Sequence, residues 1–328
     1  MTERKLKVLF HLFSYSGNGA IPSCSPAVYQ WLLAVQAKLY VDPRIESVHF
    51  IDVADTPITM VRNQAVIAAR KMKADVLVMI DSDMHPDKRL QDGDPVARPF
   101  FQSSFDFLYK HYDRGPVAIG APYCGPPPNE CVYVFHWASD QSENPNMQAR
   151  LTKYTREHAA QMIGIQHCAA LPTGLIMYDM RAFDLTEPCR KQEKLLELLM
   201  APIEQQFNDG LPFTREQMRE IVQRALDAKH NAEQSWFYYE WTDQYQQNKA
   251  STEDVTQTRD IAYHGLLQLG YNPLYCNWDA WAGHYKVKCV DKPVVLFSDD
   301  VQEKYKNAVM ENRCRVNRYM ELDLMETP

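Results

Sequence analysis

The sequence lacks three features that would each assign it to a class of proteins. No apolar run is long enough to cross a bilayer, and the beginning, MTERKLKVLFHLFSYSGN, turns polar too early for a secretory signal. Eight cysteines are present without a Cys-x-x-Cys pair, which indicates neither a zinc ribbon nor a disulfide framework. The net charge of −7 argues against nucleic-acid binding over the whole surface. We therefore expect a soluble, cytoplasmic protein with reduced cysteines and no membrane partner.

The composition is that of a globular protein. Hydrophobic residues make up 45% of the 328 residues and charged residues 23%, which excludes a disordered or collagen-like chain. This length allows one large α/β domain, or one domain with an appended lobe.

A strand that ends in two aspartates is the most informative stretch. Residues 76–80 (VLVMI) are continuously apolar, as in a parallel strand buried on both faces. Such strands end at the ligand-binding edge of open α/β sheets, so Asp81 and Asp83 should emerge there together. Two close carboxylates repel unless a cation lies between them, and a hard divalent ion keeps positions for a substrate's phosphates. The stretch predicts a metal–diphosphate site, although Asp-Ser-Asp can also end a strand as solvated turn residues.

The first third of the chain alternates strands and helices. Strands are expected at 7–13, 47–53 and 76–80, with helices at about 26–40 and 57–72 that begin with Ser-Pro and Thr-Pro cap signals. Short links and right-handed crossovers predict a Rossmann-like, doubly wound, mostly parallel sheet.

Four polar residues near the expected carboxyl edge are candidates for contacts with a bound nucleotide. Ser14 and Asp52 lie at the ends of the first two strands, and Arg62 and Asn63 lie near the start of the second helix. A loop-capping aspartate and a solvated helix face are the competing interpretations. The loop after Ser14 contains two glycines, but a G-x-G-x-x-G spacing is not completed.

Three more candidates lie in the second half of the chain. Gly174 precedes an apolar strand, where it would permit close approach of a ligand or form a tight turn. The stretch 251–254 (STED) fits a capping box for a helix that ends at Gly270, and it also contains two adjacent acids. His284 follows a strand and a glycine, where a metal ligand and a structural histidine are both possible.

In order along the chain, these features resemble the landmarks of metal-dependent glycosyltransferases of the GT-A fold. Those landmarks are a DxD triplet, a glycine-containing loop, an xED triplet and a C-terminal histidine, matched here by residues 81–83, Gly174, residues 252–254 and His284. The resemblance covers about residues 7–285. The stretch TMVRNQAVIAARKMKADVLVMIDSDMHP with a later STEDV is also similar to glycosyltransferases of bacteriophages and mobile elements, which would place the protein in a host cytoplasm.

The resemblance implies roles for the matched residues. Asp83 and His284 would bind Mn²⁺ or Mg²⁺, and Asp81 would contact the metal or the donor ribose. The metal would neutralise the leaving diphosphate of a nucleotide sugar, with UDP as the expected nucleotide. Asp254 would deprotonate the acceptor hydroxyl, with Glu253 orienting donor or acceptor. Gly174 would shape the floor under the donor sugar. The xED triplet also occurs in retaining enzymes, so inversion is only the favoured outcome.

The resemblance and the charge pattern together predict a domain organisation, although the resemblance leaves the insertion and the tail unmatched. A GT-A domain would span residues 1–292, with a nucleotide-sugar half at about 1–115 and an acceptor half at about 116–292. The charged segment at about 187–235 would be a helical insertion, and 293–328 a helical tail.

The sequence leaves the chemical identity of the sugar acceptor open. A hydroxymethylated DNA base is one hypothesis, because basic and tyrosine residues in the tail could contact phosphates and bases. A polysaccharide or protein acceptor is the alternative. The aromatic cluster at 236–241 (WFYYEW) could stack on an acceptor ring or belong to the core. A nucleotidyltransferase and a non-catalytic sugar-binding protein are further alternatives, the former disfavoured because the loop after the first strand has no Lys or Arg.

Overall fold

The protein was analysed as a computed structural model, whose described parts form two compact units, Met1–His284 and Tyr285–Pro328. The first unit ends at His284, whereas the sequence predicts a boundary after residue 292. The structure describes residues 4–14, 24–54, 57–125, 131–137, 151–186, 203–206, 208–210, 213–221, 223, 235–238, 252–285, 314–316 and 322–324. Among these residues, no helix is long and apolar enough to cross a membrane.

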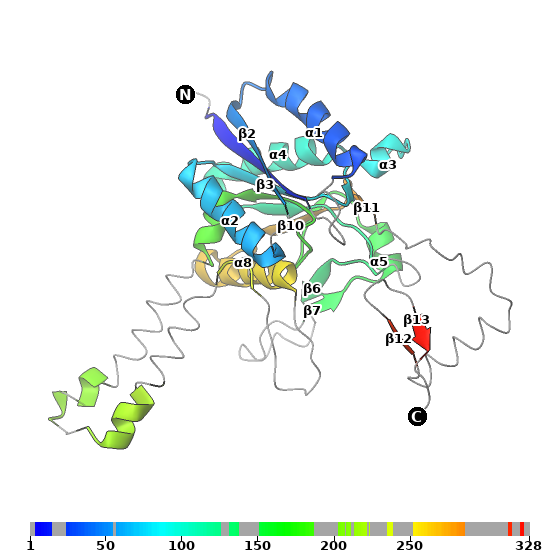
Figure 1. Cartoon of the computed structure of the whole chain (residues 1–328). Helices are drawn as coiled ribbons and strands as arrows, with labels where there is room; N and C mark the ends of the chain where they lie inside the picture. Colours follow the sequence, from blue (N-terminus) through cyan, green and yellow to red (C-terminus); the bar gives the residue numbers. More distant parts are fainter. Residues whose placement is uncertain are drawn as a thin grey trace. The chain divides into compact units, whose positions relative to one another are not determined.

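A seven-stranded sheet is the centre of the first unit (Figure 1). Its order is β2-β1-β3-β9-β5-β10-β8. β1 runs parallel to β2 and β3, and β10 runs parallel to β5, while β9 is antiparallel to both of its neighbours and β8 is antiparallel to β10. The strands are β1 (Leu6–Ser14), β2 (Ile45–Ala54), β3 (Val76–Asp81), β5 (Ala118–Gly120), β8 (Ile165–His167), β9 (Leu175–Asp179) and β10 (Leu274–Asn277). This arrangement confirms the predicted α/β class with a mostly parallel sheet.

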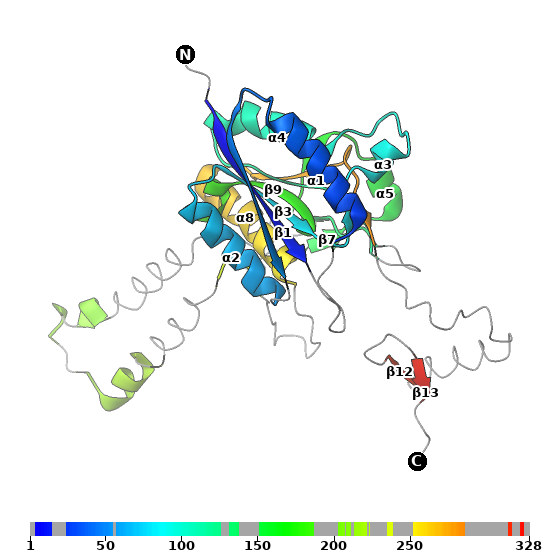
Figure 2. The same ribbon diagram turned by 45° about the horizontal axis from the view of Figure 1, so that its top comes forward.

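Helices cover both faces of this sheet (Figures 1 and 2). One face packs against α1 (Pro26–Leu39) and α4 (Phe100–His111), and the other against α2 (Ile58–Lys71) and α8 (Glu253–Leu269). Neighbouring strand residues alternate between the two cores: Phe10 belongs to the α1 and α4 side, and Leu9 to the α2 and α8 side. The continuous apolar runs of the central strands follow from this double coverage.

The start of α1 is tied to the aspartate-containing turn after β3. The Ser25 side chain caps the helix by accepting a hydrogen bond from the Val28 N–H at 3.2 Å, with Pro26 in the first helical turn as predicted. The Ser25 N–H also donates to the Ser82 carbonyl (2.8 Å), and its hydroxyl donates to the Met84 carbonyl (2.8 Å). The helix cap therefore helps to fix the turn that carries Asp81 and Asp83.

Two short strands bring distant parts of the chain together next to the aspartate-containing turn after β3. β4 (Met84–His85) pairs antiparallel with β11 (Gly283–His284), and His284 lies opposite Met84. The other described elements are α3 (Lys88–Gln91), β6 (Phe135–Trp137), which pairs with β7 (Leu151–Lys153), α5 (Arg156–Gln161), and the 3-10 turns η2 (Tyr112–Arg114) and η4 (Met180–Asp184).

The predicted insertion and tail are described only in part. Within the insertion, residues 203–206 and 215–221 are helical, and the Thr214 side chain accepts a hydrogen bond from the Gln217 N–H, as the cap signal predicts. The helical tail is wrong where the structure describes it, because β12 (Cys314–Val316) and β13 (Leu322–Leu324) form an antiparallel pair. Both triplets alternate apolar and polar residues, a strand period that the surrounding charges obscured.

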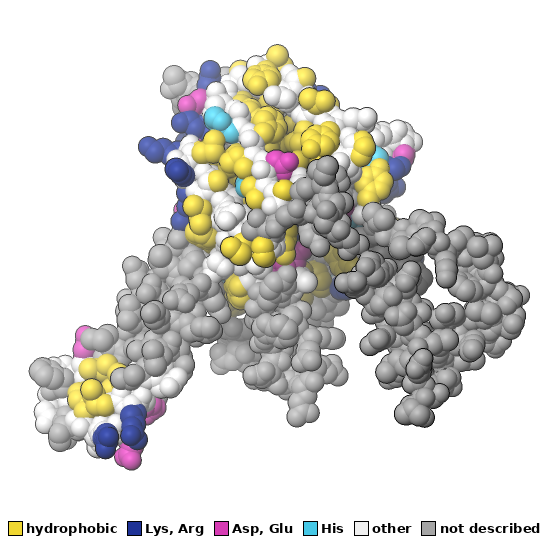
Figure 3. All heavy atoms as spheres, viewed as in Figure 1, with side chains coloured by type: hydrophobic (Ala, Val, Ile, Leu, Met, Phe, Trp, Pro, Cys, Tyr) yellow, Lys and Arg dark blue, Asp and Glu magenta, His cyan; other side chains and the backbone are white. Residues whose placement is uncertain are grey.

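Figure 3 shows where charged and apolar side chains lie on one face of the structure. Among the described side chains on this face of the first unit, apolar and polar groups are interspersed, and Lys and Arg gather mainly along one margin. This visible part therefore offers no continuous basic surface.

Candidate functional site

Backbone hydrogen bonds hold the Asp-Ser-Asp turn at the carboxyl edge of the sheet. The Asp81 N–H donates to the Gly174 carbonyl (2.8 Å), and the Ser82 N–H donates to the Phe13 carbonyl (3.0 Å). Because β9 runs antiparallel to β3, the residue that precedes β9, rather than the one that follows it, lies at this edge. The sequence-predicted residues of the DxD triplet and Gly174 are thus brought together.

Asp83 and His284 are also neighbours, as predicted. The β4–β11 pairing places His284 Nε2 at 3.1 Å from Asp83 Oδ2. The other ring nitrogen, Nδ1, lies 3.4 Å from the carbonyl oxygen of Cys124. Both nitrogens face oxygen acceptors, but a neutral imidazole has only one N–H. A ring that donates from Nδ1 to the Cys124 carbonyl would present the lone pair of Nε2 toward Asp83.

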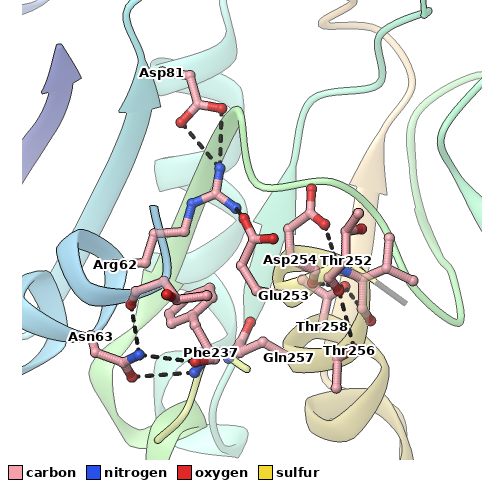
Figure 4. A network of polar contacts seen from close by, with 12 residues as sticks. Arg62, Asn63, Asp81, Phe237, Thr252, Glu253, Asp254, Thr256, Gln257 and Thr258 are labelled. Carbon is pink, nitrogen blue, oxygen red and sulfur yellow. Dashed lines mark hydrogen bonds and ion pairs between the residues drawn. The ribbon is translucent and has the colours of Figure 1, made fainter. Parts of the chain in front are cut away.

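Arg62 lies between two of the predicted acids (Figure 4). Its Nη1 donates to Glu253 Oε1 at 2.7 Å, and its Nη2 is 3.1 Å from both carboxylate oxygens of Asp81. The side chain is only 3% exposed, so the interpretation as a solvated helix face is wrong. Arg62 thus joins the end of β3 to the start of α8. Both terminal nitrogens already have carboxylate partners, so the geometry does not support the predicted contact of Arg62 with a nucleotide.

Glu253 and Asp254 occupy the first turn of α8, where the partial positive charge of a helix N-terminus favours carboxylates. Thr252 is the N-cap residue but its side chain makes no capping hydrogen bond, and Ser251 lies outside the described residues. The Asp254 Oδ1 accepts from the Val255 N–H at 2.8 Å. Burial raises the pKa of Glu253, an effect that the charge of Arg62 opposes. The helix ends at Gly270 in the left-handed conformation, as predicted.

Tyr123 is a site residue that the sequence reasoning missed. Its ring contacts the His284 ring edge-on, with 4.9 Å between centroids, and the side chain is buried. Burial, and then the charges of Asp254 and Asp81, raise its pKa well above the usual value, so the phenol stays protonated and able to donate. Its position in the proline-rich stretch PYCGPPPN gives no spacing signal that would identify it.

Gly174 leaves room for Tyr123. A Cβ at residue 174 would lie 2.8 Å from the Tyr123 hydroxyl and 2.9 Å from the Met84 sulfur. The close approach expected of a ligand is therefore made by these two side chains. The role of Gly174 in shaping the floor under a donor sugar stays a prediction.

Ser14 and Asp52 meet at the ends of the first two strands. The Ser14 hydroxyl donates to Asp52 Oδ1 at 2.7 Å, and Ser14 is buried while Asp52 is exposed. This hydrogen bond orients the exposed carboxylate at the carboxyl edge, which is compatible with the predicted nucleotide contact.

Asn63 has a structural role. Its Nδ2 donates to the carbonyls of Thr59 (2.7 Å) and Phe237 (2.9 Å), while its Oδ1 accepts from the Phe237 N–H (3.2 Å). No amide N–H remains for a nucleotide, so the geometry does not support that predicted contact. Phe237 is fully buried, and Trp236 packs against the core, which places this part of the aromatic cluster inside the protein. Residues 239–241 lie outside the described residues.

The charges and the possible ligand atoms at the carboxyl edge of the sheet decide whether this edge can hold a metal ion. Arg62 is paired with carboxylates, yet Asp81, Asp83, Glu253 and Asp254 together carry more negative charge than it neutralises. The described part of the chain contains no group of three or more His, Cys, Asp or Glu side chains arranged to hold a metal ion. The three predicted ligands Asp81, Asp83 and His284 thus do not form such a group, and metal binding by Asp83 and His284 stays a prediction.

Comparisons with known proteins do not assign a family. No family model matches the chain, and no curated protein matches it. Among solved structures, A197 from STIV is 10% identical with a TM-score of 0.41, covering 98% of this chain and 96% of that one. HddC from Yersinia pseudotuberculosis is 11% identical with a TM-score of 0.24, covering 54% and 78% respectively. At these scores the likenesses carry no argument about fold or function, and the resemblance to GT-A enzymes stays a prediction.

Proposed function

We propose that the protein is a metal-dependent glycosyltransferase that moves a sugar from a nucleotide sugar, with UDP as the expected nucleotide, to an acceptor hydroxyl. The observation that carries this proposal is the contact between Asp83 and His284. The two residues are 201 positions apart in sequence, and Nε2 and Oδ2 are 3.1 Å apart at the carboxyl edge of the sheet. The backbone carbonyl of Cys124 faces Nδ1, the usual way in which a metal-binding imidazole is oriented.

Asp83 and His284 would hold Mn²⁺ or Mg²⁺, of which Mn²⁺ better suits a mixed imidazole and carboxylate set. The metal would supply charge neutralisation for the leaving diphosphate. Asp52, oriented by Ser14 at the ends of β1 and β2, would accept hydrogen bonds from the nucleoside.

Asp254 is the proposed base. The acceptor oxygen forms a bond to the anomeric carbon, the bond from that carbon to the diphosphate oxygen breaks, and the acceptor proton passes to Asp254. The electrostatic influence of Asp254 on both Tyr123 and Arg62 supports its place at the same edge as the donor residues. The Tyr123 phenol, which burial keeps protonated, would donate to the substrate.

Thermal unfolding with nucleotides tests metal-dependent binding. We expect UDP with Mn²⁺ to raise the Tm, while UDP alone has little effect, because a ligand at 100 times its Kd stabilises the folded state by about 2.7 kcal/mol. Asp83→Asn should abolish this shift. Asp92→Asn is the matched control, since it removes an exposed carboxylate that pairs with Lys88 on α3. Equal shifts in both variants would contradict the proposal.

Release of UDP from UDP-sugars then separates catalysis from binding. Asp254→Asn should retain the Mn²⁺-dependent Tm shift and lose about 10²- to 10⁴-fold in turnover, the usual effect of removing a general base. If the wild type releases UDP no faster than Asp83→Asn while still binding it, the protein is a sugar-binding protein rather than an enzyme.

A further inference from the structure

Arg62 is an exception within the buried face of α2. The other buried residues of this helix are apolar, namely Val61, Ala65, Val66 and Ala69, whereas Arg62 places a charged group among them at 3% exposure. Burying an unpaired charge costs several kcal/mol, so the guanidinium depends on its carboxylate partners. This dependence works in both directions, because the partners also lose their counter-ion if the guanidinium is removed.

The two partners come from the two motifs of the proposed active site. Nη2 lies 3.1 Å from both oxygens of Asp81, at the end of β3, and Nη1 lies 2.7 Å from Glu253, in the first turn of α8. A planar guanidinium holds its N–H groups in a fixed fork, so these contacts set the distance between the strand end and the helix start (Figure 4). A lysine ammonium is a point charge on a flexible chain and cannot reproduce that fork.

Asp254 follows Glu253 directly in the same helical turn. Any displacement of the Glu253 backbone therefore moves Asp254 as well, although within the described part of the chain the side-chain hydrogen bonds of Arg62 go to Asp81 and Glu253 rather than to Asp254 itself. A displacement of about 1 Å in a catalytic group can cost about 100-fold in rate.

We propose that Arg62 is a positioning residue that couples the donor-side aspartate, Asp81, to the helix turn carrying the base, Asp254, through its contact with Glu253. The expected loss of kcat rests on the proposed glycosyl transfer. The expected change in the first turns of α8 rests only on the contacts of Arg62 with Asp81 and Glu253. Arg62 acts through its carboxylate partners and does not contact the nucleotide.

Three variants test the coupling. Arg62→Lys keeps the charge and loses the fork, and Glu253→Gln keeps the side-chain shape and loses the ion pair. Arg70→Lys is the matched control, because Arg70 lies on the same helix and pairs with Asp184 at 2.9 Å on the surface. With UDP-glucose, Mn²⁺ and water as acceptor, we expect Arg62→Lys and Glu253→Gln each to lower kcat about 10- to 100-fold with KM changed by less than about threefold. Their double variant should lose little more than either alone, and Arg70→Lys should match the wild type.

Hydrogen exchange provides a readout that does not need activity. In Arg62→Lys, amides in the first two turns of α8 should exchange at least about tenfold faster, while those of Arg70→Lys should not change. Wild-type kcat and exchange in folded Arg62→Lys would overturn the coupling. An unchanged kcat with a higher KM and weaker UDP binding would overturn it as well, since Arg62 would then contact the nucleotide. If the wild type neither binds UDP with Mn²⁺ nor releases it, the proposed function fails, and the exchange data alone decide whether Arg62 positions α8.

Discussion

At the scale of single residues, Gly174 offers a direct test of how closely the site is packed. Gly174→Ala adds a methyl group 2.8 Å from the Tyr123 hydroxyl and 2.9 Å from the Met84 sulfur. We expect the free energy of unfolding to fall by about 1–3 kcal/mol, the usual cost of overpacking, as measured by urea denaturation.

Removing the Tyr123 hydroxyl provides the control for this prediction. Tyr123→Phe in the Gly174→Ala background eliminates the 2.8 Å contact and should recover part of the lost stability. Purely additive effects of the two substitutions would mean that the hydroxyl is not what excludes a side chain at residue 174.

Residue chemistry also explains why Tyr123 could not be found from the sequence. Asp81, Asp83, Gly174, Glu253, Asp254 and His284 each belong to a short motif with a known order along the chain. Tyr123 belongs to none, and its importance depends on packing between Gly174 and His284, which are 110 residues apart in sequence. Arg62 contacts two of the predicted acids, but its burial was not expected, because a helix face is read from apolar spacing and an arginine breaks that spacing.

At the scale of secondary-structure elements, Asn63 anchors the segment at residues 235–238 to α2. Asn63→Asp replaces the two N–H donors to the Thr59 and Phe237 carbonyls with a negatively charged oxygen. We expect a loss of about 2 kcal/mol in unfolding free energy, since two carbonyls lose their donors. Gln64→Glu makes the same chemical change at an exposed neighbour and should change stability by less than about 0.5 kcal/mol. Similar losses in both variants would show that helix charge, not the anchor, is responsible.

The elements themselves differ in how far they could be predicted. Long apolar patterns and cap signals predict β1, α1, β2, α2 and β3. These elements include the first three strands of the sheet. The apolar run of β9 does not indicate in which direction the strand runs, because LIMYD would be equally buried in either orientation. The strand pair β12 and β13 was mistaken for helix because each strand has only three residues, so the surrounding charges obscured its short alternation.

At the scale of the whole molecule, one buried histidine should make stability depend on pH. His11 lies in the middle of β1 with 1% exposure, its Nδ1 has no hydrogen-bond partner among the described residues, and burial lowers its pKa to about 4. An unfolded histidine binds a proton below about pH 6.5, while the folded one stays neutral to about pH 4. The unfolded state thus binds more protons in this window, so stability is retained above pH 6.5 and falls by about 3 kcal/mol toward pH 4.

Urea denaturation from pH 7.5 to 4 would measure this effect. The wild type should lose stability faster than His11→Phe over the window, because the substitution removes the proton uptake on unfolding. His49→Phe, at an exposed histidine on the adjacent strand β2, should keep the wild-type dependence. Parallel curves for the wild type and His11→Phe would exclude His11 as the cause.

The pairing of β4 with β11 has a consequence for biosynthesis. Asp83 leaves the ribosome 201 residues before its partner His284. The β1–β3 half of the sheet can assemble while translation continues, but the contact between Asp83 and His284 can form only once nearly the entire first unit has been made. Nascent chains truncated before Gly283 would therefore lack the β4–β11 pair, so any function that depends on this contact must appear late in maturation.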